Sequence, residues 1–566
     1  MRKVFCVCVV FLIFFAGNGF AQTVGEIQKT NRDIEMEKAM RSILEKEKKP
    51  VEIEKPVLPT EPALEGDSQI KTLVKRISVT GVSLVPQYKI DEIIAMYRGK
   101  ELTVREMKEV ADRITDIYRQ RGFITSRAYL PPQKIENGVM EIRVVEGVTG
   151  SVEITGNKFF NNLLIERNLG LVKGDPFNFT TLQEGLRRVN EHPDRHAKAV
   201  LVPGNGPGET DVKVEVKDSL PMHVAFDYDN FGSRLIDRNR FRTTLMHNNF
   251  LGHGDIFSFQ YQLGEGENYR LLGARYLYPL NDTFTAGFHA FRTKVDLRRE
   301  SEDLHSRGKS SLYSLFLNQN IFETENTNIE LNYGFDYNDI FNFQLGDEIS
   351  RDRLRMLRLG LDIDVTDIYG RNIINNDLKF GIPDMFGGLD SVDARASRDG
   401  AGGKFIKDEL YLMRLQKMPV ESVLLWKNHI QISPYILPAS EQFQLGGIAN
   451  VRGYPPAEAV GDEGYSMTWE WSFPFYFIPR DTKVPFSRSK LYDALRFDFI
   501  YDWGHTHLHR PLTGEEKHKT LRSAGFGLRF SLPENFSCRI DFAWPLDNMP
   551  SDNDHMHQWI EISTIF

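Results

Sequence analysis

Cysteine and long apolar runs are both scarce in this sequence. It contains three cysteines in 566 residues, and two of them, Cys6 and Cys8, lie within the first 21 residues. The rest of the chain has the single thiol of Cys538, which excludes a disulfide framework. After the first 21 residues no stretch is apolar enough for a transmembrane helix, which needs about 20 apolar residues. Both a soluble exported protein and a β-barrel membrane protein are compatible with this composition.

The sequence also lacks an excess of one charge and the motifs of common enzymes. The net charge is -8 with both signs interspersed, which gives no indication of nucleic acid binding. Gly308-Lys309-Ser310 has Asp303 where a phosphate-binding loop requires its first glycine. No Gly-x-Ser-x-Gly nucleophile elbow occurs before residue 220. We therefore expect no enzyme activity, no cofactor and no nucleic-acid partner.

One histidine-rich segment is a candidate metal site. His505, His507 and His509 alternate with other residues, so on an extended segment their side chains share one face. No acidic residue or cysteine accompanies them in the sequence, although such residues commonly complete a metal site. We interpret this segment as a solvated loop and predict no bound metal.

Residues 1–21 have the pattern of a secretory signal. Arg2 and Lys3 are basic, an unbroken apolar run extends from Val4 to Ala16, and small residues surround Ala21. The run is too short to be interpreted as a membrane-spanning helix, although an uncleaved anchor is the alternative. The pattern predicts that the mature chain is exported.

The next two segments differ sharply in composition. Residues 22–48 are highly charged and helical by propensity. Residues 49–70 are interpreted as a linker because prolines recur through them, at Pro50, Pro56, Pro59 and Pro62. The first segment is either a disordered tail or a helix that docks elsewhere in the protein, and propensity alone does not choose between them.

Residues 71–219 contain an internal duplication. The segment from Ile77 to Gly81 is echoed by the segment from Val152 to Gly156, each a predicted strand that ends in a turn glycine. Two helices and two further strands are predicted after each. The second helix of each copy is predicted to begin with a capping box, formed by Thr103 with Glu106 and by Thr181 with Glu184. We therefore predict two tandem α+β domains, residues 71–147 and 148–219.

From residue 220 to residue 566 the pattern changes to alternation. The segment from Phe497 to Trp503 places aromatic side chains on one face and Asp498 and Asp502 on the other. This arrangement suits a barrel that faces lipid outside and water inside. All six tryptophans follow residue 420, as interfacial aromatic girdles favour. We identify sixteen candidate strands and predict an all-β transmembrane barrel of sixteen antiparallel strands, with a large soluble β-sandwich as the alternative.

Three motifs resemble one family of bacterial proteins. The segment from Gly122 to Gln133 resembles the first periplasmic, or POTRA, domain of TpsB-type two-partner secretion transporters. These transporters form the haemolysin and filamentous-haemagglutinin secretion and activation family of the Omp85 superfamily. The residues of this POTRA motif are Arg127, Leu130, Pro131, Pro132 and Gln133. A second motif resembles the sixth extracellular loop of the superfamily. A third, Asp502-Trp503-Gly504, is similar to the motif of the wall strand that follows that loop. The loop motif comprises Gly446, Gly447, Val451, Arg452, Gly453 and Tyr454.

The resemblance implies a conformational lock between Arg452 and Asp502. In the family the loop folds back into the barrel lumen, where its arginine meets an acidic group on the inner wall. Alternation supports this independently, because Trp503 facing lipid requires Asp502 to face inward. An arginine is also the side chain whose fork fits a carboxylate. One departure concerns Ile500, which stands where the superfamily often has an aromatic residue.

The resemblance also implies the function and the partners. The POTRA domains would recognise an unfolded secreted exoprotein, of adhesin or cytolysin type, and the barrel would pass it to the cell surface without ATP. Residues 22–48 would form a helix that plugs the barrel. Phe566, with Ile560, Ile562 and Thr564 on its face, resembles the signal read by the outer-membrane assembly machinery. An assembly factor of the same superfamily is the alternative, and a passive porin is disfavoured by the duplicated domains.

Overall fold

A computed structural model describes residues 24–45, 52–54, 70–298, 305–324, 326–485, 487–533 and 535–566. The predicted signal at residues 1–21 lies outside these described residues. The chain divides into two compact units, one of residues 1–46 with 222–566 and one of residues 47–221. Among the described residues no helix combines the length and the apolar character needed to span a membrane.

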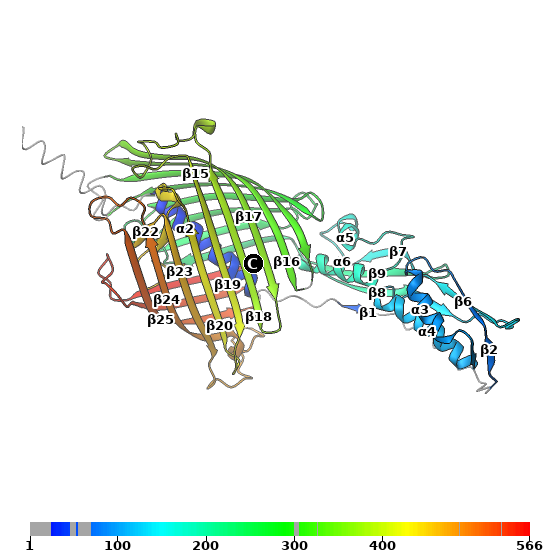
Figure 1. The fold of residues 1–566 in the computed structure, drawn as a ribbon. Coiled ribbons are helices and arrows are strands. Elements are labelled where there is room, and N and C mark those ends of the chain that lie inside the picture. Colours follow the sequence, from blue (N-terminus) through cyan, green and yellow to red (C-terminus); the bar gives the residue numbers. More distant parts are fainter. Residues whose placement is uncertain are drawn as a thin grey trace, which may run out of the picture. The chain divides into compact units, whose positions relative to one another are not determined.

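Sixteen antiparallel strands close into a barrel, as the alternation predicts (Figure 1). The closure is made by β10 and β27, whose residues Ala225 and Ile565 are paired. The alternation predicts a strand near residue 354, and the structure extends it back to Asp347, the start of β17, through residues that are mostly polar. The strands are β10 (Met222–Asp229), β11 (Arg240–His247), β12 (Ile256–Gly264), β13 (Tyr269–Pro279), β14 (Phe284–Asp296), β15 (Arg307–Glu323), β16 (Thr327–Gln344), β17 (Asp347–Thr366), β18 (Gly370–Gly381), β19 (Phe405–Lys417), β20 (Val423–Ile432), β23 (Glu463–Pro474), β24 (Leu495–His507), β25 (His518–Leu532), β26 (Phe536–Pro545) and β27 (His557–Ile565).

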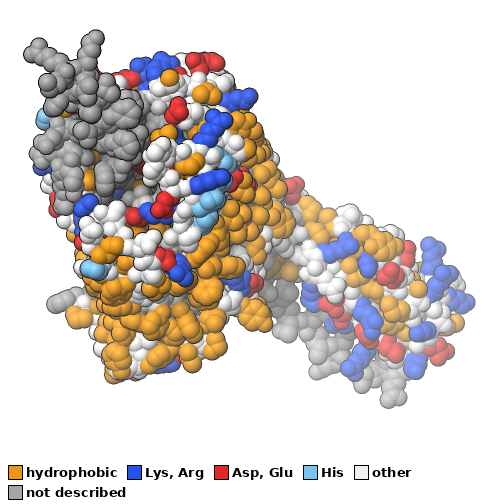
Figure 2. Space-filling view, turned by 60° about the vertical axis from the view of Figure 1, so that its left-hand side comes forward, with side chains coloured by type: hydrophobic (Ala, Val, Ile, Leu, Met, Phe, Trp, Pro, Cys, Tyr) orange, Lys and Arg blue, Asp and Glu red, His pale blue; other side chains and the backbone are white. Residues whose placement is uncertain are grey.

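The barrel wall has an apolar outside and a polar inside. Figure 2 shows a broad band of hydrophobic side chains on the outer surface, with charged side chains gathered beside it. Trp426, Trp469, Trp471 and Trp544 are exposed on this surface, as an aromatic girdle requires. Trp559 departs from that expectation because its side chain is buried. It belongs to the lumen, where it packs against other apolar residues.

The first α+β domain has a three-stranded sheet in the order β3-β6-β5. Helix α4 contributes Val110, Ile114 and Tyr118 to its core, all of them fully buried. The predicted capping box at the start of α4 is present, with Thr103 and Glu106 each bonding the other's backbone N–H. The elements are β2 (Thr72–Val74), β3 (Arg76–Thr80), α3 (Gln87–Tyr97), β4 (Lys100–Leu102), α4 (Val104–Gln120), β5 (Arg127–Tyr129) and β6 (Val139–Val145).

The second α+β domain repeats this topology in the sheet order β1-β8-β9-β7. The expected capping box of Thr181 and Glu184 is wrong, because helix α6 begins earlier, after Asn178. The Asn178 side chain accepts a hydrogen bond from the Thr180 N–H and so provides the N-cap. The elements are β7 (Val148–Thr155), α5 (Asn162–Leu169), α6 (Phe179–Glu191), β8 (Arg195–Pro203) and β9 (Glu209–Asp218). Strand β1 (Ile53–Glu54), within the expected linker, pairs in parallel with β8.

The duplication extends to the turn after the first strand of each domain. Gly81 and Gly156 both have positive φ, 85° and 90°. A Cβ atom would lie 2.3 Å from the Val144 carbonyl oxygen at the first and 2.5 Å from that of Val216 at the second. Both turns therefore require glycine, because the backbone at each turn passes close to the last strand of its own domain.

A carboxylate completes each of these turns. Glu146 accepts hydrogen bonds from the N–H groups of Ser83 at 2.7 Å and Leu84 at 2.8 Å. In the second domain Asp218 accepts from the N–H groups that follow Gly156. Burial opposes the charge of Glu146, but the hydrogen bonds from Ser83, Leu84 and Tyr118 outweigh it and lower its pKa. The same contact and burial raise the pKa of Tyr118.

Candidate functional site

The long loop between β20 and β23 folds back into the barrel. It carries the short helix η3 (Ala439–Glu441) and the hairpin of β21 (Phe443–Leu445) with β22 (Ala459–Gly461). Gly446 has φ +104°, and a Cβ atom there would lie 2.0 Å from the Pro455 carbonyl oxygen. The side chain of Asn450 accepts from the Gly446 N–H at 2.8 Å and donates to the Gln444 carbonyl at 2.9 Å. These contacts fix the shape of the loop tip.

The loop tip presses against the inner wall. Val451, Arg452 and Tyr454 are fully buried. A Cβ atom on Gly453 would lie 2.6 Å from Ser523 Cβ and 2.8 Å from the Pro545 backbone nitrogen. The glycine is therefore needed for the loop to reach the wall at β25 and β26.

Arg452 lies against Asp502 of β24. Its Nε donates to Asp502 Oδ2 at 3.0 Å and its Nη2 to Oδ1 at 2.8 Å, a bidentate pair in which neither side chain is exposed. The Arg452 backbone N–H adds a third contact to Oδ2 at 3.1 Å, and the Ser523 hydroxyl donates to that oxygen at 3.0 Å. Ile500, two residues earlier on the same inner face, is buried as well.

Two further acidic residues share the Arg452 guanidinium. Its Nη1 donates to Glu470 Oε1 at 3.0 Å and to Asp541 Oδ2 at 3.2 Å. Neither Glu470 nor Asp541 was predicted from the sequence. Alternation in β23 gave a usable indication for Glu470, because Trp469 and Trp471 on either side face outward. Nothing local indicated that Asp541 and Glu470 converge on the same arginine, since they lie on different strands.

Helix α2 (Val24–Glu45) lies inside the barrel, where Figure 1 shows it crossing behind the wall strands. Among the described side chains of α2, three charged ones, Lys29, Asp33 and Glu37, are buried beside three apolar ones. Lys29 donates to Asp33 and to Glu409 of β19, both at 2.6 Å. Glu37 accepts from Lys427 of β20 at 2.9 Å. The charged, weakly apolar helix thus uses ion pairs where a globular core uses apolar contacts.

The helix and the folded-back loop also touch directly. Thr30 donates from its hydroxyl to the Gln444 side-chain oxygen at 2.7 Å. Arg32 pairs with Glu441 at 3.3 Å. Ile34 packs in an apolar cluster with Phe231, Ile448 and Trp559. The helix therefore cannot leave the lumen without breaking contacts with the loop.

Glu470 is bonded by both elements at once. Arg41 of α2 donates from Nη2 to Glu470 Oε1 at 2.9 Å, and Arg452 of the loop donates from Nη1 to the same oxygen at 3.0 Å. Arg539 and Lys427 lie within 3.9 Å of it. One wall carboxylate therefore joins the internal helix to the loop tip.

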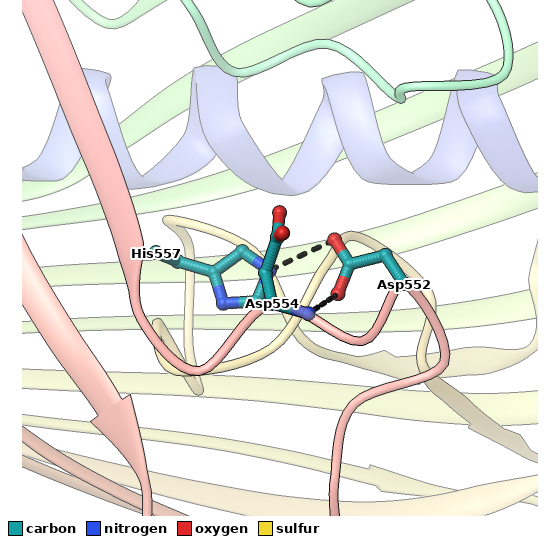
Figure 3. Close-up of side chains that lie close together, drawn as sticks. All are labelled: Asp552, Asp554 and His557. Atoms are coloured by element: carbon teal, nitrogen blue, oxygen red, sulfur yellow. Dashed lines mark hydrogen bonds and ion pairs between the residues drawn. The ribbon is translucent and has the colours of Figure 1, made fainter.

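One group at the end of the barrel has the composition of a metal site. Among the residues that the structure describes, possible ligand atoms of Asp552, Asp554 and His557 lie within 4.8 Å of one another (Figure 3). The guanidinium of Arg238 already pairs with Asp552 at 3.3 Å and with Asp554 at 2.9 Å. His557 is bonded through Nε2 to Asp552 at 3.0 Å. The group thus joins two loops by an internal ion pair, and a cation would have to displace Arg238.

The histidine segment has an acidic neighbour that was not predicted from the sequence. His507 Nδ1 lies 3.2 Å from Glu463 Oε2, and His509 Nε2 lies 3.9 Å from Oε1. His507 and Glu463 are paired positions of β24 and β23. The acidic partner therefore comes from the neighbouring strand β23 and not from the histidine segment itself. His505 and His507 lie in β24 itself, so the segment is not wholly a loop as expected.

The POTRA motif residues have structural roles in the first domain. The Gln133 side chain donates to the Glu141 carbonyl at 2.7 Å and accepts from its N–H at 2.8 Å, as a paired strand residue would. Leu130 packs on the domain core. Pro131 is buried, whereas Pro132 and Arg127 are exposed. The motif therefore prolongs the β5 edge of the sheet.

Phe566 directly follows the last barrel strand, β27. Its N–H donates to the Val224 carbonyl at 2.9 Å, which continues the pairing of β27 with β10. Its ring contacts Phe226 edge-on, with centroids 6.4 Å apart, and its side chain is 68% exposed. Ile562 and Phe566 thus lie on the outer surface of the closing pair of strands.

With this geometry established, comparison with known proteins gives one consistent result. Residues 208–530 match the family described as haemolysin secretion/activation protein ShlB/FhaC/HecB. Residues 72–147 match the ShlB-type POTRA domain. These matches cover most of the barrel and the first α+β domain.

Individual relatives agree with this match. The chain is 23% identical over 491 residues to the heme/hemopexin transporter protein HuxB of Haemophilus influenzae, covering 84% of each chain. It is 25% identical over 423 residues to the outer membrane transporter CdiB of Escherichia coli, covering 72% of this chain and 70% of that one. The solved structure of CdiB from Escherichia coli has the same fold, with a TM-score of 0.73, 20% identity, and coverage of 97% of this chain and 100% of that one. The chain therefore belongs to the haemolysin secretion/activation protein family, the outer-membrane transporters of two-partner secretion in the Omp85 superfamily.

Proposed function

We propose that the described lumen is the closed, resting arrangement of the secretion channel. Arg452 and Asp502 act in it as a conformational lock and perform no chemistry. The observation that carries this proposal is the shared carboxylate of Glu470, which joins the plug helix α2 to the loop tip. Opening then requires both elements to release one wall residue.

The electrostatics of the network make this release cooperative. Removing one member of a buried ion pair leaves an uncompensated charge, which costs about 3–5 kcal/mol. When Arg452 leaves the wall, it breaks its ion pairs with Asp502, Glu470 and Asp541 at the same time, so this cost applies to all three. Water that enters the lumen offsets the cost by solvating the separated charges. A hydrated passage and a closed, ion-paired lumen are therefore alternative states of the same residues.

The cargo of this transporter is a secreted exoprotein of adhesin or cytolysin type that arrives unfolded at the two α+β domains. An extended chain can add to an exposed sheet edge through main-chain hydrogen bonds. The first domain offers the β5 edge. In the second domain β1 already pairs with β8, so that edge accepts an extended segment. No nucleotide is needed, because folding of the cargo outside the cell makes its transport irreversible.

Single-channel conductance in planar bilayers tests the closed state. Deletion of residues 22–48 is expected to give large and steady openings, because it removes α2 and its ion pairs. The matched control is Glu35→Gln, which removes an α2 carboxylate that is 46% exposed and pairs with Arg242. The control should retain the small conductance of the wild type. Two folded proteins with equal and negligible conductance would contradict the channel and plug proposal.

We further propose that Phe566 belongs to the signal read by the outer-membrane assembly machinery. Its exposed ring at the end of β27 supports this, because the side chain contributes little to the barrel interior. Deletion of Phe566 is expected to reduce the amount of folded barrel in the membrane. Refolding of the purified variant in detergent should be normal. Impaired refolding would instead assign the residue to barrel closure.

A further inference from the structure

A row of cations crosses the outer surface of the barrel. Arg270 of β13 is directly opposite Lys294 of β14, and Lys294 is directly opposite Lys309 of β15. All three are exposed, whereas the adjacent Tyr269, Val295 and Ser310 are buried toward the inside. Because side chains alternate along a strand, the three cations project from the same outer face. We call Arg270, Lys294 and Lys309, with Arg292 beside them, the outer cation row.

The row lies at the extracellular end of these strands. Strand β10 begins at Met222, directly after the second α+β domain ends, so it runs away from the periplasm. Neighbouring strands are antiparallel, so β12 and β14 run in the same direction. Lys294 is near the end of β14, Arg270 is at the start of β13 and Lys309 at the start of β15. The outer cation row therefore faces the outer leaflet of the membrane.

The positive charge of the row is only partly neutralised by the protein. Arg270 pairs with Glu267 at 2.7 Å, and Asp296 is opposite Arg307. Among the residues that the structure describes, neither Lys294 nor Lys309 forms an ion pair. Like charges directly opposite on an antiparallel pair are destabilising. The arrangement therefore favours an anion from outside the protein.

The surroundings of the row fit a headgroup better than a free ion. Arg292 donates to the Tyr313 hydroxyl at 3.1 Å, one position closer to the membrane interior. Lys309 Nζ lies 5.6 Å from the centre of the Phe343 ring. Exposed apolar side chains, including Leu272 and Leu315, continue toward the membrane interior. Cations above an apolar surface match an amphiphile that has an anionic head and acyl chains.

We propose that the outer cation row binds a phosphate group of an outer-leaflet glycolipid. Such lipids present phosphates at the height where the strands end, and each phosphate accepts charge-assisted hydrogen bonds from Lys and Arg. The bound phosphate relieves the repulsion between Lys294 and Lys309. This site is independent of the lumen lock and of the plug, because it lies on the opposite face of the wall.

Native mass spectrometry of the purified full-length protein with added lipid A tests the proposal. Lys294→Gln with Lys309→Gln keeps the apolar stems and removes two charges. Affinity for phosphorylated lipid A should fall about tenfold or more, since hydrogen bonds to charged groups are strong. The matched control is Arg522→Gln, a rim cation on β25 that already pairs with Asp547 at 2.6 Å. The affinity of this control for phosphorylated lipid A should equal that of the wild type.

Two further ligands identify the source of the phosphate. Dephosphorylated lipid A should bind equally weakly to wild type and double variant, and inorganic phosphate should not displace the lipid at equimolar concentration. Equal binding of phosphorylated lipid A by wild type and double variant would overturn the proposal. An equal loss of lipid A affinity in Arg522→Gln would also overturn it, because any cation at the rim would then have the same effect. Displacement of the lipid by inorganic phosphate would overturn it as well, because the site would then bind anions in general. Heat-modifiable migration on gels confirms beforehand that each variant is a folded barrel.

Discussion

The two units of this chain fill their interiors in opposite ways. The first α+β domain buries apolar side chains such as Val110 and Ile114, whereas the barrel buries Lys29, Arg452 and Asp502. Both interiors hold fully buried side chains, yet one depends on the hydrophobic effect and the other on paired charges. An apolar core is lost only by unfolding, because water gains nothing by entering it. A charged interior can be opened by hydration, which suits the part of the molecule that has to move.

The first prediction tests the charged interior where it is most connected. Arg452→Ala removes the cation shared by Asp502, Glu470 and Asp541. The closed state should lose about 3–5 kcal/mol because three carboxylates are left without it. Secretion of the partner exoprotein should fall at least about tenfold while the barrel stays folded, because transport needs the loop tip held in its arrangement and not only an open channel. Quantification of secreted cargo beside heat-modifiable migration measures both.

Arg452→Lys is the matched variant for this prediction. It keeps the charge but not the bidentate fork to Asp502. Its secretion should lie between the wild type and Arg452→Ala. Normal secretion by both variants would show that the lock is not needed for transport.

The second prediction tests the apolar interior. Ile114→Ala in α4 should destabilise the first α+β domain by about 2–5 kcal/mol, because it leaves a cavity at a fully buried site. Hydrogen exchange of the full-length protein should become faster across α4 and β6, with the barrel strands unchanged. If exchange in the barrel accelerated equally, the two interiors would not be independent.

The third prediction tests the connection between plug and loop. Glu470→Gln removes the charge that Arg41 and Arg452 share, and should raise the frequency of channel openings about tenfold, since each charged hydrogen bond contributes roughly 1.5–3 kcal/mol. The control is Glu561→Gln, which removes the ion pair that Lys38 of α2 makes with the wall strand β27. It should affect openings less. An equal increase in opening frequency in both variants would show that Glu470 holds the plug no more strongly than its other contacts do.

The smallest effect is expected at the turn of the first α+β domain. The pKa of Glu146 is lowered in the folded protein, so its charge stabilises the domain above the ordinary glutamate pKa of about 4.3, and that contribution is lost as pH falls through the lowered pKa. Glu146→Gln should cost about 1 kcal/mol at pH 7, a value limited by the partial exposure of the carboxylate. Hydrogen exchange near Ser83 at pH 7 and below pH 4 measures this. A cost that persists unchanged in acid would exclude the charge as its cause.

Much of the fold follows from local pattern. The alternation of the barrel, its sixteen strands and the capping box of Thr103 with Glu106 were predictable, because each depends on residues close in sequence. The capping box at Thr181 was wrong because a competing cap, Asn178, lies three residues earlier. Trp559 was misassigned to the girdle because composition does not tell a lumen-facing tryptophan from an interfacial one.

The lumen was predictable only in part. Alternation places Asp502 inward, and the resemblance pairs it with Arg452. Glu470 was accessible by the same alternation, but its two partners, Arg41 and Arg452, are separated by hundreds of residues. The acidic neighbour of His507 was missed for the same reason, since Glu463 lies on another strand.

The sequence by itself determined which faces are apolar, which segments form most of the strands and helices, and that the periplasmic unit is duplicated. These depend on periodicity and short-range hydrogen bonding, which act within a few residues. Only the tertiary structure decided which charges meet in the lumen and which cations align on the outer wall. Register and barrel closure set those neighbours, and Coulomb interactions depend on distance in space and not on distance along the chain.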